Sequence, residues 1–298
     1  MFRVRDKTIK VEAPAKINLY LDVLEKRFDG YHEVKMVMQT VSLCDRLTIS
    51  VDKSLEDVQL EVINADIPEN DDNLIIKSIR LLQEYYQIPP LKIVVDKEIP
   101  VAAGLAGGSS DAAATIWGIA ELLELQIKQE QLAYLASEIG SDVPFCLLGG
   151  TSLAEGRGEK LTNASTLPQC YILLVKPPFG VSTGQVYKAV NPTDEADSRA
   201  DKIISALSKG SLYKVIENMY NKMENVVFGW HPELLDLTKR LLDFGALTVR
   251  MSGSGPTIFG VFESYLDAYN VKKSLLKEMP EHEIFLTTPR DKGVGKEH

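Results

Sequence analysis

The sequence predicts an α+β protein built of two domains. Its 298 residues suffice for two domains of ordinary size, and 45% hydrophobic with 25% charged residues is the composition of a globular chain. Strand-like alternation dominates up to about residue 165, whereas helical periodicity dominates after about residue 170. We therefore expect one domain over residues 1–165 and a second over residues 166–298.

The first domain is expected to consist of strands with helices inserted between them. Apolar residues alternate with a period of two in several stretches, and a turn at residues 28–30 separates the first two. The predicted strands cover residues 7–24, 34–51, 58–63 and 91–95. Asn73 opens a helix, because Ile75 and Ile79 lie on one helical face, and the two prolines at 89–90 end it.

The most unusual segment of the first domain is a loop of small residues over positions 100–111. It ends in a Ser-Ser-Asp triplet, and these residue types cap helices, so we expect the alanine-rich helix that follows to begin at residue 112. Apolar residues on all sides of that helix predict a central, buried position. A further helix is expected over residues 128–139, where Gly140 ends it.

The second domain is expected to open with a strand over residues 170–175 and to continue mainly with helices. The predicted helices cover residues 203–207, 212–228, 233–244 and 264–277. A strand–turn–strand unit over residues 246–262 and a strand over 283–286 complete the domain. Residues 191–202 are predicted to form a polar connector, and residues 289–298 a loose tail.

The charge balance limits the classes of partner. With 33 Lys and Arg against 42 Asp and Glu, the formal net charge is −9. Nucleic-acid binding depends on basic side chains that displace counterions from phosphates, so this acidic excess argues against a nucleic-acid partner. Any phosphate that the protein binds must be held by a local arrangement of groups.

Cysteine and histidine usage points away from disulfides and zinc. Cys44, Cys146 and Cys170 stand singly in apolar runs, which is typical of a reducing compartment. The four histidines lie far apart, without a cysteine or second histidine at ligand spacing, which argues against a zinc site. No apolar run reaches the length of a membrane span, so we expect a cytoplasmic protein without membrane contact.

Two loops of small residues are candidate anion sites. Backbone N–H groups at a helix N-terminus bind anions, and glycine lets phosphate oxygens approach the main chain of the loop over residues 100–111. Its spacing matches neither GxxxxGK[ST] nor GxGxxG, which excludes the P-loop and the Rossmann fingerprint. A second loop, residues 252–257, offers another nest of N–H groups. A tight turn or hairpin is the alternative for each loop taken alone.

Further candidate residues also have structural alternatives when each is considered by itself. Lys16 and Asn18, two apart in an alternating strand, point to the same face, and a solvated edge strand is the alternative. Asp142 follows a helix end, where capping of a helix or a place in a turn is the alternative. Tyr31 and His32 follow a turn, and by default they would be a turn aromatic and a solvated histidine.

Together these segments form an ordered set of motifs. In chain order the six motifs are PAKINLYLDV, DGYHEV, PVAAGLAGGSSDAAA, GSDVPF, GVST and SGSGPT. In this order and spacing the chain resembles the GHMP kinase superfamily, named for galactokinase, homoserine kinase, mevalonate kinase and phosphomevalonate kinase. The resemblance covers nearly the whole chain. PAKINL and DGYHE discriminate among members, whereas the glycine-rich loop is common to all of them.

The resemblance implies a fold and a reaction. The implied two-domain GHMP kinase fold has a ribosomal-protein-like N-terminal domain and a ferredoxin-like C-terminal domain, with ATP and a cytidine-diphosphate-linked methylerythritol in the cleft between them. The implied reaction transfers the γ-phosphoryl group of ATP, with Mg²⁺, to the 2-hydroxyl of that alcohol in nonmevalonate isoprenoid precursor biosynthesis. A monomer or a weak homodimer is expected.

The resemblance also assigns roles to individual residues, with the metal ligands left open. The catalytic pair would be Lys16 and Asp142. The loop that holds the phosphates of ATP would be Pro100, Val101, Ala102, Ala103, Gly104, Leu105, Ala106, Gly107, Gly108, Ser109 and Ser110. The adenine neighbourhood would be Asn73, Leu74 and Lys97. The contacts to the alcohol substrate would be Asn18, Tyr31, His32, Thr183 and Tyr187.

Four residues of the loop region depart from the pattern of relatives. Ala102, Ala103 and Ala106 occupy positions that are often glycine, so close approach of phosphate depends on the remaining glycines. Asp111 stands where some relatives carry asparagine. A negative charge beside phosphates is costly unless Mg²⁺ or the helix cap absorbs it, so Asp111 is assigned no catalytic role.

These assignments suit phosphoryl transfer, in which the protein mainly positions two oxygens and stabilises charge. Asp142 would orient the hydroxyl and accept its proton, while Lys16 keeps that carboxylate ionised. His32, Tyr31 and Tyr187 suit a flat pyrimidine, by hydrogen bonding and stacking. Two alternatives stay open: a kinase of another small alcohol, such as mevalonate or homoserine, and a relative that binds ATP without turnover as a regulator.

Overall fold

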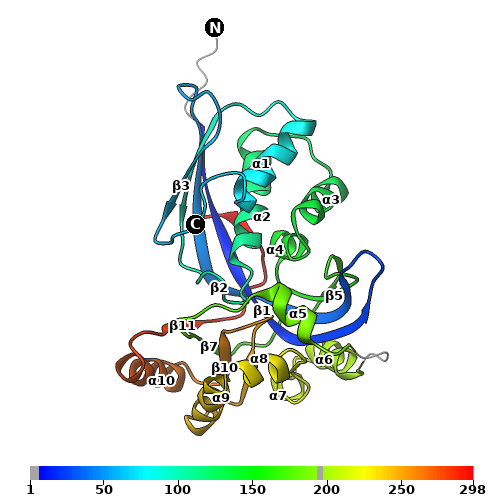
Figure 1. Cartoon of the computed structure of the whole chain (residues 1–298), viewed down its shortest axis with the longest axis vertical. Coiled ribbons are helices and arrows are strands. Elements are labelled where there is room, and N and C mark those ends of the chain that lie inside the picture. The colour runs from blue at the N-terminus through cyan, green and yellow to red at the C-terminus, as the bar shows by residue number, and fades with distance from the viewer. Residues whose placement is uncertain (1–6, 193–196, 298) are drawn as a thin grey trace.

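The computed structural model describes residues 7–192 and 197–297, which form two lobes (Figure 1). The N-terminal lobe contains a mixed sheet in the order β12-β1-β2-β4-β3, to which β5, β6 and β8 are attached. The C-terminal lobe contains an antiparallel sheet in the order β11-β7-β10-β9. Sheets and helices in both lobes confirm the α+β class. The division at residue 165 falls between β6 and β7 and stays a prediction.

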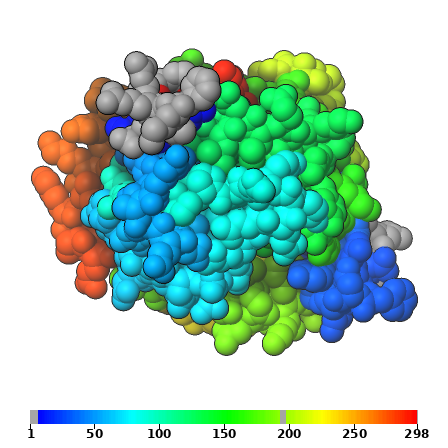
Figure 2. Space-filling model, turned by 90° about the horizontal axis from the view of Figure 1, so that it is seen from above, coloured from blue at the N-terminus to red at the C-terminus, as the bar shows by residue number. Residues whose placement is uncertain are grey.

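Two long strands connect the lobes. β1 (Thr8–Lys26) and β2 (His32–Val51) pair antiparallel over nearly their whole length, and their far end runs down beside the C-terminal lobe in Figure 1. Seen from above in Figure 2, the tip of this hairpin (blue) projects from the body of the molecule. The pairing register shifts between Pro14 and Lys16, because proline has no N–H for the ladder. This irregularity lies where the candidate residues of β1, Lys16 and Asn18, begin.

Four helices cover one face of the N-terminal sheet (Figure 1). They are α1 (Leu74–Tyr85), α2 (Gly107–Leu122), α3 (Gln129–Ile139) and α4 (Val143–Leu148). Four further strands of this lobe are β3 (Gln59–Ile63), β4 (Leu91–Asp96), β5 (Thr151–Glu155) and β6 (Lys160–Ala164). The alanine-rich α2 is buried at the centre of the helical layer, as expected, and its small side chains let β1, α1 and α4 pack close to it. Asn73 caps α1 by accepting a hydrogen bond from the amide of Ile75, which confirms the predicted helix start.

The C-terminal sheet is buried on both faces. Its strands are β7 (Tyr171–Lys176), β9 (Thr248–Met251), β10 (Ile258–Phe262) and β11 (Glu283–Thr287). One face packs against α9 (Glu233–Asp243) and α10 (Tyr265–Glu278), and the other against α6 (Arg199–Ser208), α7 (Leu212–Ile216) and the apolar face of β1. The expected connector over residues 191–202 lies partly outside the described residues, and α6 begins within it.

Three expectations are wrong. The helix predicted over residues 212–228 is divided into α7, β8 (Tyr220–Asn221) and α8 (Glu224–Trp230), because Asn221 donates to the carbonyls of Met251 and Gly253 and accepts from the amide of Met223. These bonds tie the chain to the loop after β9 and interrupt the helical ladder.

The second wrong expectation concerns the start of the alanine-rich helix. It begins at Gly107 rather than at residue 112, so Ser109, Ser110 and Asp111 lie inside its first turns and cap nothing. Ser110 instead donates to the carbonyl of Pro14 at 2.8 Å. The third is the tail: residues 289–297 lie against the N-terminal lobe, where β12 (Gly295–Lys296) pairs with β1.

Two short elements near the site were not predicted, α4 and α5 (Thr183–Ala189). Six and seven residues are too few for a helical repeat to stand out from a generally apolar stretch. Across residues 7–192 and 197–297, the structure has no helix with the length and apolarity needed to cross a membrane.

Candidate active site

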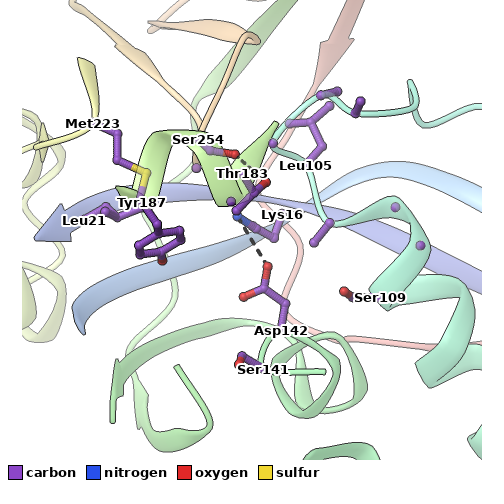
Figure 3. Close-up of a pocket in the computed structure, with 18 of the residues that line it drawn as sticks. Lys16, Leu21, Leu105, Ser109, Ser141, Asp142, Thr183, Tyr187, Met223 and Ser254 are labelled. Atoms are coloured by element: carbon purple, nitrogen blue, oxygen red, sulfur yellow. Dashed lines mark hydrogen bonds and ion pairs between the residues drawn. The ribbon is translucent and has the colours of Figure 1, made fainter. Parts of the chain in front are cut away.

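A cavity of about 960 Å³ opens between the two lobes. Its N-terminal wall includes Lys16 and Asp142 together with the small-residue loop, and its C-terminal wall includes Thr183 and Tyr187 (Figure 3). The sequence therefore identified residues of one cavity, although they lie up to 171 positions apart, from Lys16 to Tyr187. Residues 100–109 all line it.

The loop is held by the second small-residue segment, residues 252–257. Gly104 has φ +75°, and a Cβ at this position would overlap the carbonyl oxygen of Ser252, so only glycine fits. The Ser252 hydroxyl also donates to the carbonyl of Gly104 at 3.0 Å. Gly253 and Ser254 line the cavity beside this contact. The segment forms a turn after β9 that packs against the loop and also contributes to the cavity wall.

Two alanines of the loop adopt a backbone conformation that favours glycine. Ala102 has φ 52° and Ala106 has φ 59°, in the left-handed region that glycine adopts most readily. The left-handed region costs a Cβ-bearing residue roughly 1–2 kcal/mol. The loop thus keeps the shape that glycine would allow, at the cost of strain. Ala106 stands at the N-cap of α2, so this conformation directs the chain into the helix.

Lys16 is positioned by the strand irregularity and by its neighbours. Its amide donates to the carbonyl of Leu105 at 3.1 Å, which ties β1 to the loop. Its ammonium donates to the side-chain oxygen of Asn18 at 2.8 Å and lies 3.9 Å from a carboxylate oxygen of Asp142 (Figure 3). Lys16 is 5% exposed and β1 lies between β12 and β2, so the alternative of a solvated edge strand is wrong.

Asp142 precedes α4 and does not cap it. Its side chain makes no capping hydrogen bond, and a third of it is exposed, at 32%. The side chain therefore does not cap the helix, whereas the residue does lie in a turn, and its carboxylate is available to the cavity that it lines. The position of Asn18 differs from that of Asp142. It is fully buried, does not line the cavity, and its amide donates to the sulfur of Met36 at 3.4 Å, so it supports Lys16 from below.

Lys97, Asp45 and Asp111 form a buried charge cluster next to the loop, and Lys97 also lines the cavity. The Lys97 ammonium pairs with Asp45 and lies 2.5 Å from Asp111. Asp45 also accepts from the amides of Glu98 and Ile99. In the structure, Lys97 therefore neutralises the charge of Asp111. The sequence had suggested Mg²⁺ or the helix cap for this purpose. Because one ammonium faces two carboxylates, the cluster carries a net charge of −1 when both are ionised.

Burial changes the protonation of this cluster. Burial raises the pKa of Asp111 from 3.8 to about 8, and the neighbouring Asp45 adds to the effect while Lys97 opposes it. The Oδ1 atom of Asp111 has no hydrogen-bond partner among the described residues. The attraction of the two carboxylates raises the pKa of Lys97, although its burial acts in the opposite direction.

Aromatic side chains gather at the end of the cavity near the β1–β2 hairpin. The rings of His32 and Tyr187 stack with centroids 5.5 Å apart, and the guanidinium of Arg157 lies 5.1 Å from the ring centroid of Tyr31. Burial, and to a lesser degree the charge of Lys26, lowers the pKa of His32. Burial raises the pKa of Tyr187. Both side chains are thus neutral near pH 7 and suited to hydrogen bonding with an uncharged ring.

The remaining predicted residues are placed as follows. Leu74 lines the cavity, whereas Asn73 does not, because its side chain caps α1. Thr183 lines the cavity and shares a 2.8 Å hydrogen bond with Ser254 (Figure 3). Ser110 is buried against Pro14 and does not line the cavity, while Ser109 does.

Sequence reasoning missed several polar residues of the cavity wall. They are Lys26, Ser141, Arg157 and Lys188. Arg157 lies in the turn between β5 and β6. The sequence shows only a polar stretch there, and it does not indicate that this turn contacts the tip of the β1–β2 hairpin. The amide of Gly156 donates to Glu33, and the amide of Val34 donates to the carbonyl of Gly156, which joins the two segments.

The oxygen donors of the cavity are few. Within residues 7–192 and 197–297, no group of three His, Cys, Asp or Glu is arranged to hold a metal ion. Mg²⁺ in nucleotide sites commonly takes only one or two protein oxygens, with phosphates and water as the other ligands. Ser109 and Asp142 line the cavity next to the loop, so the residues present fit such a site.

The protein has two lobes, a strained small-residue loop that leads into a helix, and a lysine and an aspartate that face the same cavity. This is the organisation of a small-molecule kinase. Family models agree: the GHMP kinases N-terminal domain matches residues 73–150, and the GHMP kinases C-terminal domain matches residues 203–281. The chain belongs to the GHMP kinases.

Individual relatives place it within that family. A curated protein named 4-diphosphocytidyl-2-C-methyl-D-erythritol kinase, from Bacillus cytotoxicus, is 46% identical over 254 residues, covering 84% of this chain and 87% of the relative. A crystal structure of 4-(cytidine 5′-diphospho)-2C-methyl-D-erythritol kinase superposes with a TM-score of 0.79 at 33% identity, covering 94% of this chain and 99% of that one. L. major mevalonate kinase in complex with R-mevalonate has a TM-score of 0.77 at 17% identity, covering 98% and 100%, which shows a common fold.

Proposed function

We propose that this chain transfers the γ-phosphoryl group of ATP to the 2-hydroxyl of 4-diphosphocytidyl-2-C-methyl-D-erythritol, giving the 2-phosphate and ADP. The reaction is a step of nonmevalonate isoprenoid precursor biosynthesis. The observation that carries the proposal is the 46% identity to a kinase of that name over 84% of the chain. The site supports it, because the phosphate loop, an ammonium and a carboxylate all face one cavity.

The loop and the start of α2 bind the phosphates of ATP in this proposal. The first amides of a helix lack intrahelical partners, and the helix dipole adds partial positive charge there. Gly107 and Gly108 leave the main chain open to phosphate oxygens. Leu74 forms part of the wall next to the loop and contacts adenine. Lys97 supports the loop from the adjoining buried cluster, since its ammonium is taken up by Asp45 and Asp111.

Asp142 acts as the general base toward the hydroxyl. An alcohol is too weak an acid to ionise at pH 7, so the carboxylate orients the hydroxyl and accepts its proton as the new P–O bond forms. Lys16, fixed by Asn18, stabilises the ionised carboxylate and the charge on the transferring group. When bound, Mg²⁺ neutralises charge on the phosphates, and the Ser109 hydroxyl would hold it together with phosphate oxygens.

The aromatic end of the cavity takes the cytosine. Tyr31 and Tyr187 offer ring faces for stacking, and a neutral His32 both donates and accepts hydrogen bonds. Thr183 lies between this end and Lys16 and contacts the alcohol. These four residues, rather than the buried Asn18, form the substrate side of the proposed site.

An ADP-release assay on the purified chain tests the function. With ATP and Mg²⁺, we expect turnover with the diphosphocytidyl methylerythritol and none with mevalonate or homoserine. Phosphorus NMR of the product would show a new phosphomonoester beside an unchanged diphosphate. ADP release with another alcohol alone would contradict the substrate assignment, and ATP binding without turnover on any of them would indicate a regulatory binding protein.

A further inference from the structure

The segment after β11 crosses from the C-terminal sheet to the helices of the N-terminal lobe. We name residues 289–297 the C-terminal strap. At its start, Pro289 forms a bridge with Val41, and the amide of Arg290 donates to the carbonyl of Thr40 at 2.9 Å. The side chain of Gln39 donates to the carbonyl of Arg290 at 3.0 Å. At its far end the strap forms β12 on the edge of β1.

Between these two anchors the strap meets the C-terminal end of α4. The amide of Val294 donates to the carbonyl of Cys146 at 3.1 Å, and the amide of Gly293 donates to that of Leu148 at 3.3 Å. Carbonyls in the last turn of a helix have no partner within the helix. The strap therefore supplies hydrogen-bond donors that α4 itself lacks. A helix of six residues has little stability of its own, so such external contacts decide where it lies.

The contact between strap and helix leaves no room for side chains. A Cβ on Gly293 would overlap the carbonyl oxygen of Cys146 and lie 2.7 Å from that of Leu147. A Cβ on Gly149, which has φ +73°, would overlap the backbone of Lys292 and Gly293. Two glycines thus bring backbone against backbone. By contrast, a Cβ on Gly295 would meet nothing within 4 Å.

Asp142 immediately precedes α4, so its place in the cavity depends on where that helix lies. We infer that the C-terminal strap is a positioning element for phosphoryl transfer, and that Gly293 sets the distance between the Asp142 carboxylate and the Lys16 ammonium by fixing α4. Gly293 lies against the C-terminal end of α4, opposite Asp142, and does not line the cavity. This inference rests on the proposed function, because it takes Asp142 as the catalytic base.

The pair Gly293→Ala and Gly295→Ala tests the inference, since each adds one methyl group to the same strap. Displacement of a catalytic group by about 1 Å can lower a rate by roughly 100-fold. For Gly293→Ala we expect kcat to fall by roughly 10- to 100-fold, with the KM values for ATP and for the alcohol within about twofold of wild type. Gly295→Ala is expected to retain wild-type kcat.

Hydrogen exchange of the amides of residues 143–148 supplies a readout independent of turnover. We expect faster exchange in Gly293→Ala than in Gly295→Ala at equal fractions of folded protein. Arg290→Met serves if Gly293→Ala does not fold, because it removes the 2.7 Å bond from Arg290 to Glu12 without adding bulk to the contact with α4. It should lower kcat by a smaller factor and speed the same exchange.

Wild-type kcat in Gly293→Ala, or an equal loss in both glycine variants, would overturn the inference. So would a rise in KM without a fall in kcat. If the wild-type chain does not phosphorylate the proposed substrate, the proposed function fails, and the exchange comparison alone then decides whether the strap fixes α4. Unchanged exchange in Gly293→Ala would reject the positioning role in either case.

Discussion

The ammonium of Lys16 lies 2.8 Å from the side-chain oxygen of Asn18, closer than it lies to the carboxylate of Asp142. For Asn18→Ala we expect a fall in kcat with an unchanged KM for the alcohol, because Asn18 acts by holding Lys16. Steady-state kinetics with both substrates would measure the split. A raised KM with normal kcat would instead place Asn18 in contact with the substrate.

Replacement of Lys16 should have a larger effect than replacement of its supporting residue. Lys16→Ala removes the positive charge next to the reacting groups, and loss of one such group costs roughly 10²- to 10³-fold in kcat. We expect the KM for ATP to change little, since the loop holds the phosphates. Single-turnover measurements would check that the chemical step is slowed, and a pure KM effect would move Lys16 to a binding role.

Asp142→Asn keeps the shape of the side chain and removes the proposed general base. We expect kcat to fall by roughly 10²- to 10⁴-fold, with ATP affinity unchanged by calorimetry. Asp142 makes no capping bond to α4, so the folded state should keep its stability. Near wild-type kcat with purified substrate would show that another group accepts the proton.

Ala106→Gly should stabilise the protein, because glycine adopts φ 59° without strain. Relief of roughly 1–2 kcal/mol of strain, less roughly 0.5–1 kcal/mol for the greater freedom of glycine in the unfolded chain, leaves a gain of up to about 1.5 kcal/mol. Urea unfolding would measure it. The control is Ala113→Gly, in the interior of α2, which should lose about 1 kcal/mol. A loss in both variants would contradict the strain argument.

The pH dependence of stability should report the buried cluster next to the loop. Because the pKa of Asp111 is raised from 3.8 to about 8, the folded state binds more protons than the unfolded state between these values. Stability contributed by that proton is complete below about pH 4 and is lost as pH rises to about 8. In Asp111→Asn this loss should disappear, as urea unfolding at pH 5 and pH 8 would show. Parallel pH profiles of the two proteins would mean that Asp111 stays ionised.

Local features of the site could be predicted from the sequence, whereas its long-range pairs could not. The alternation of β1 correctly placed Lys16 and Asn18 on one face, and Asn73 correctly marked the start of α1. The partners of Lys97 could not be predicted, because Asp45 and Asp111 lie 52 and 14 residues away on other elements. Lys97 pairs with these two carboxylates because all three side chains are buried together, which the residue type alone does not predict.

The first turn of α2 shows a different limit of sequence reasoning. Serine and aspartate favour caps, yet the tertiary bonds of Ser110 to Pro14 and of Asp111 to Lys97 compete with capping and move the helix start to Gly107. Arg157 was missed for a related reason, since only the fold brings its turn to Tyr31.

Because β12 comes last in the sequence and pairs with β1, the N-terminal sheet can be completed only after the C-terminal lobe has been synthesised. Until then the nascent chain exposes the unpaired edge of β1 and an α4 whose last carbonyls lack their donors. A chain interrupted before the strap would therefore lack the donors to the end of α4, and the helix that follows Asp142 would be unsupported.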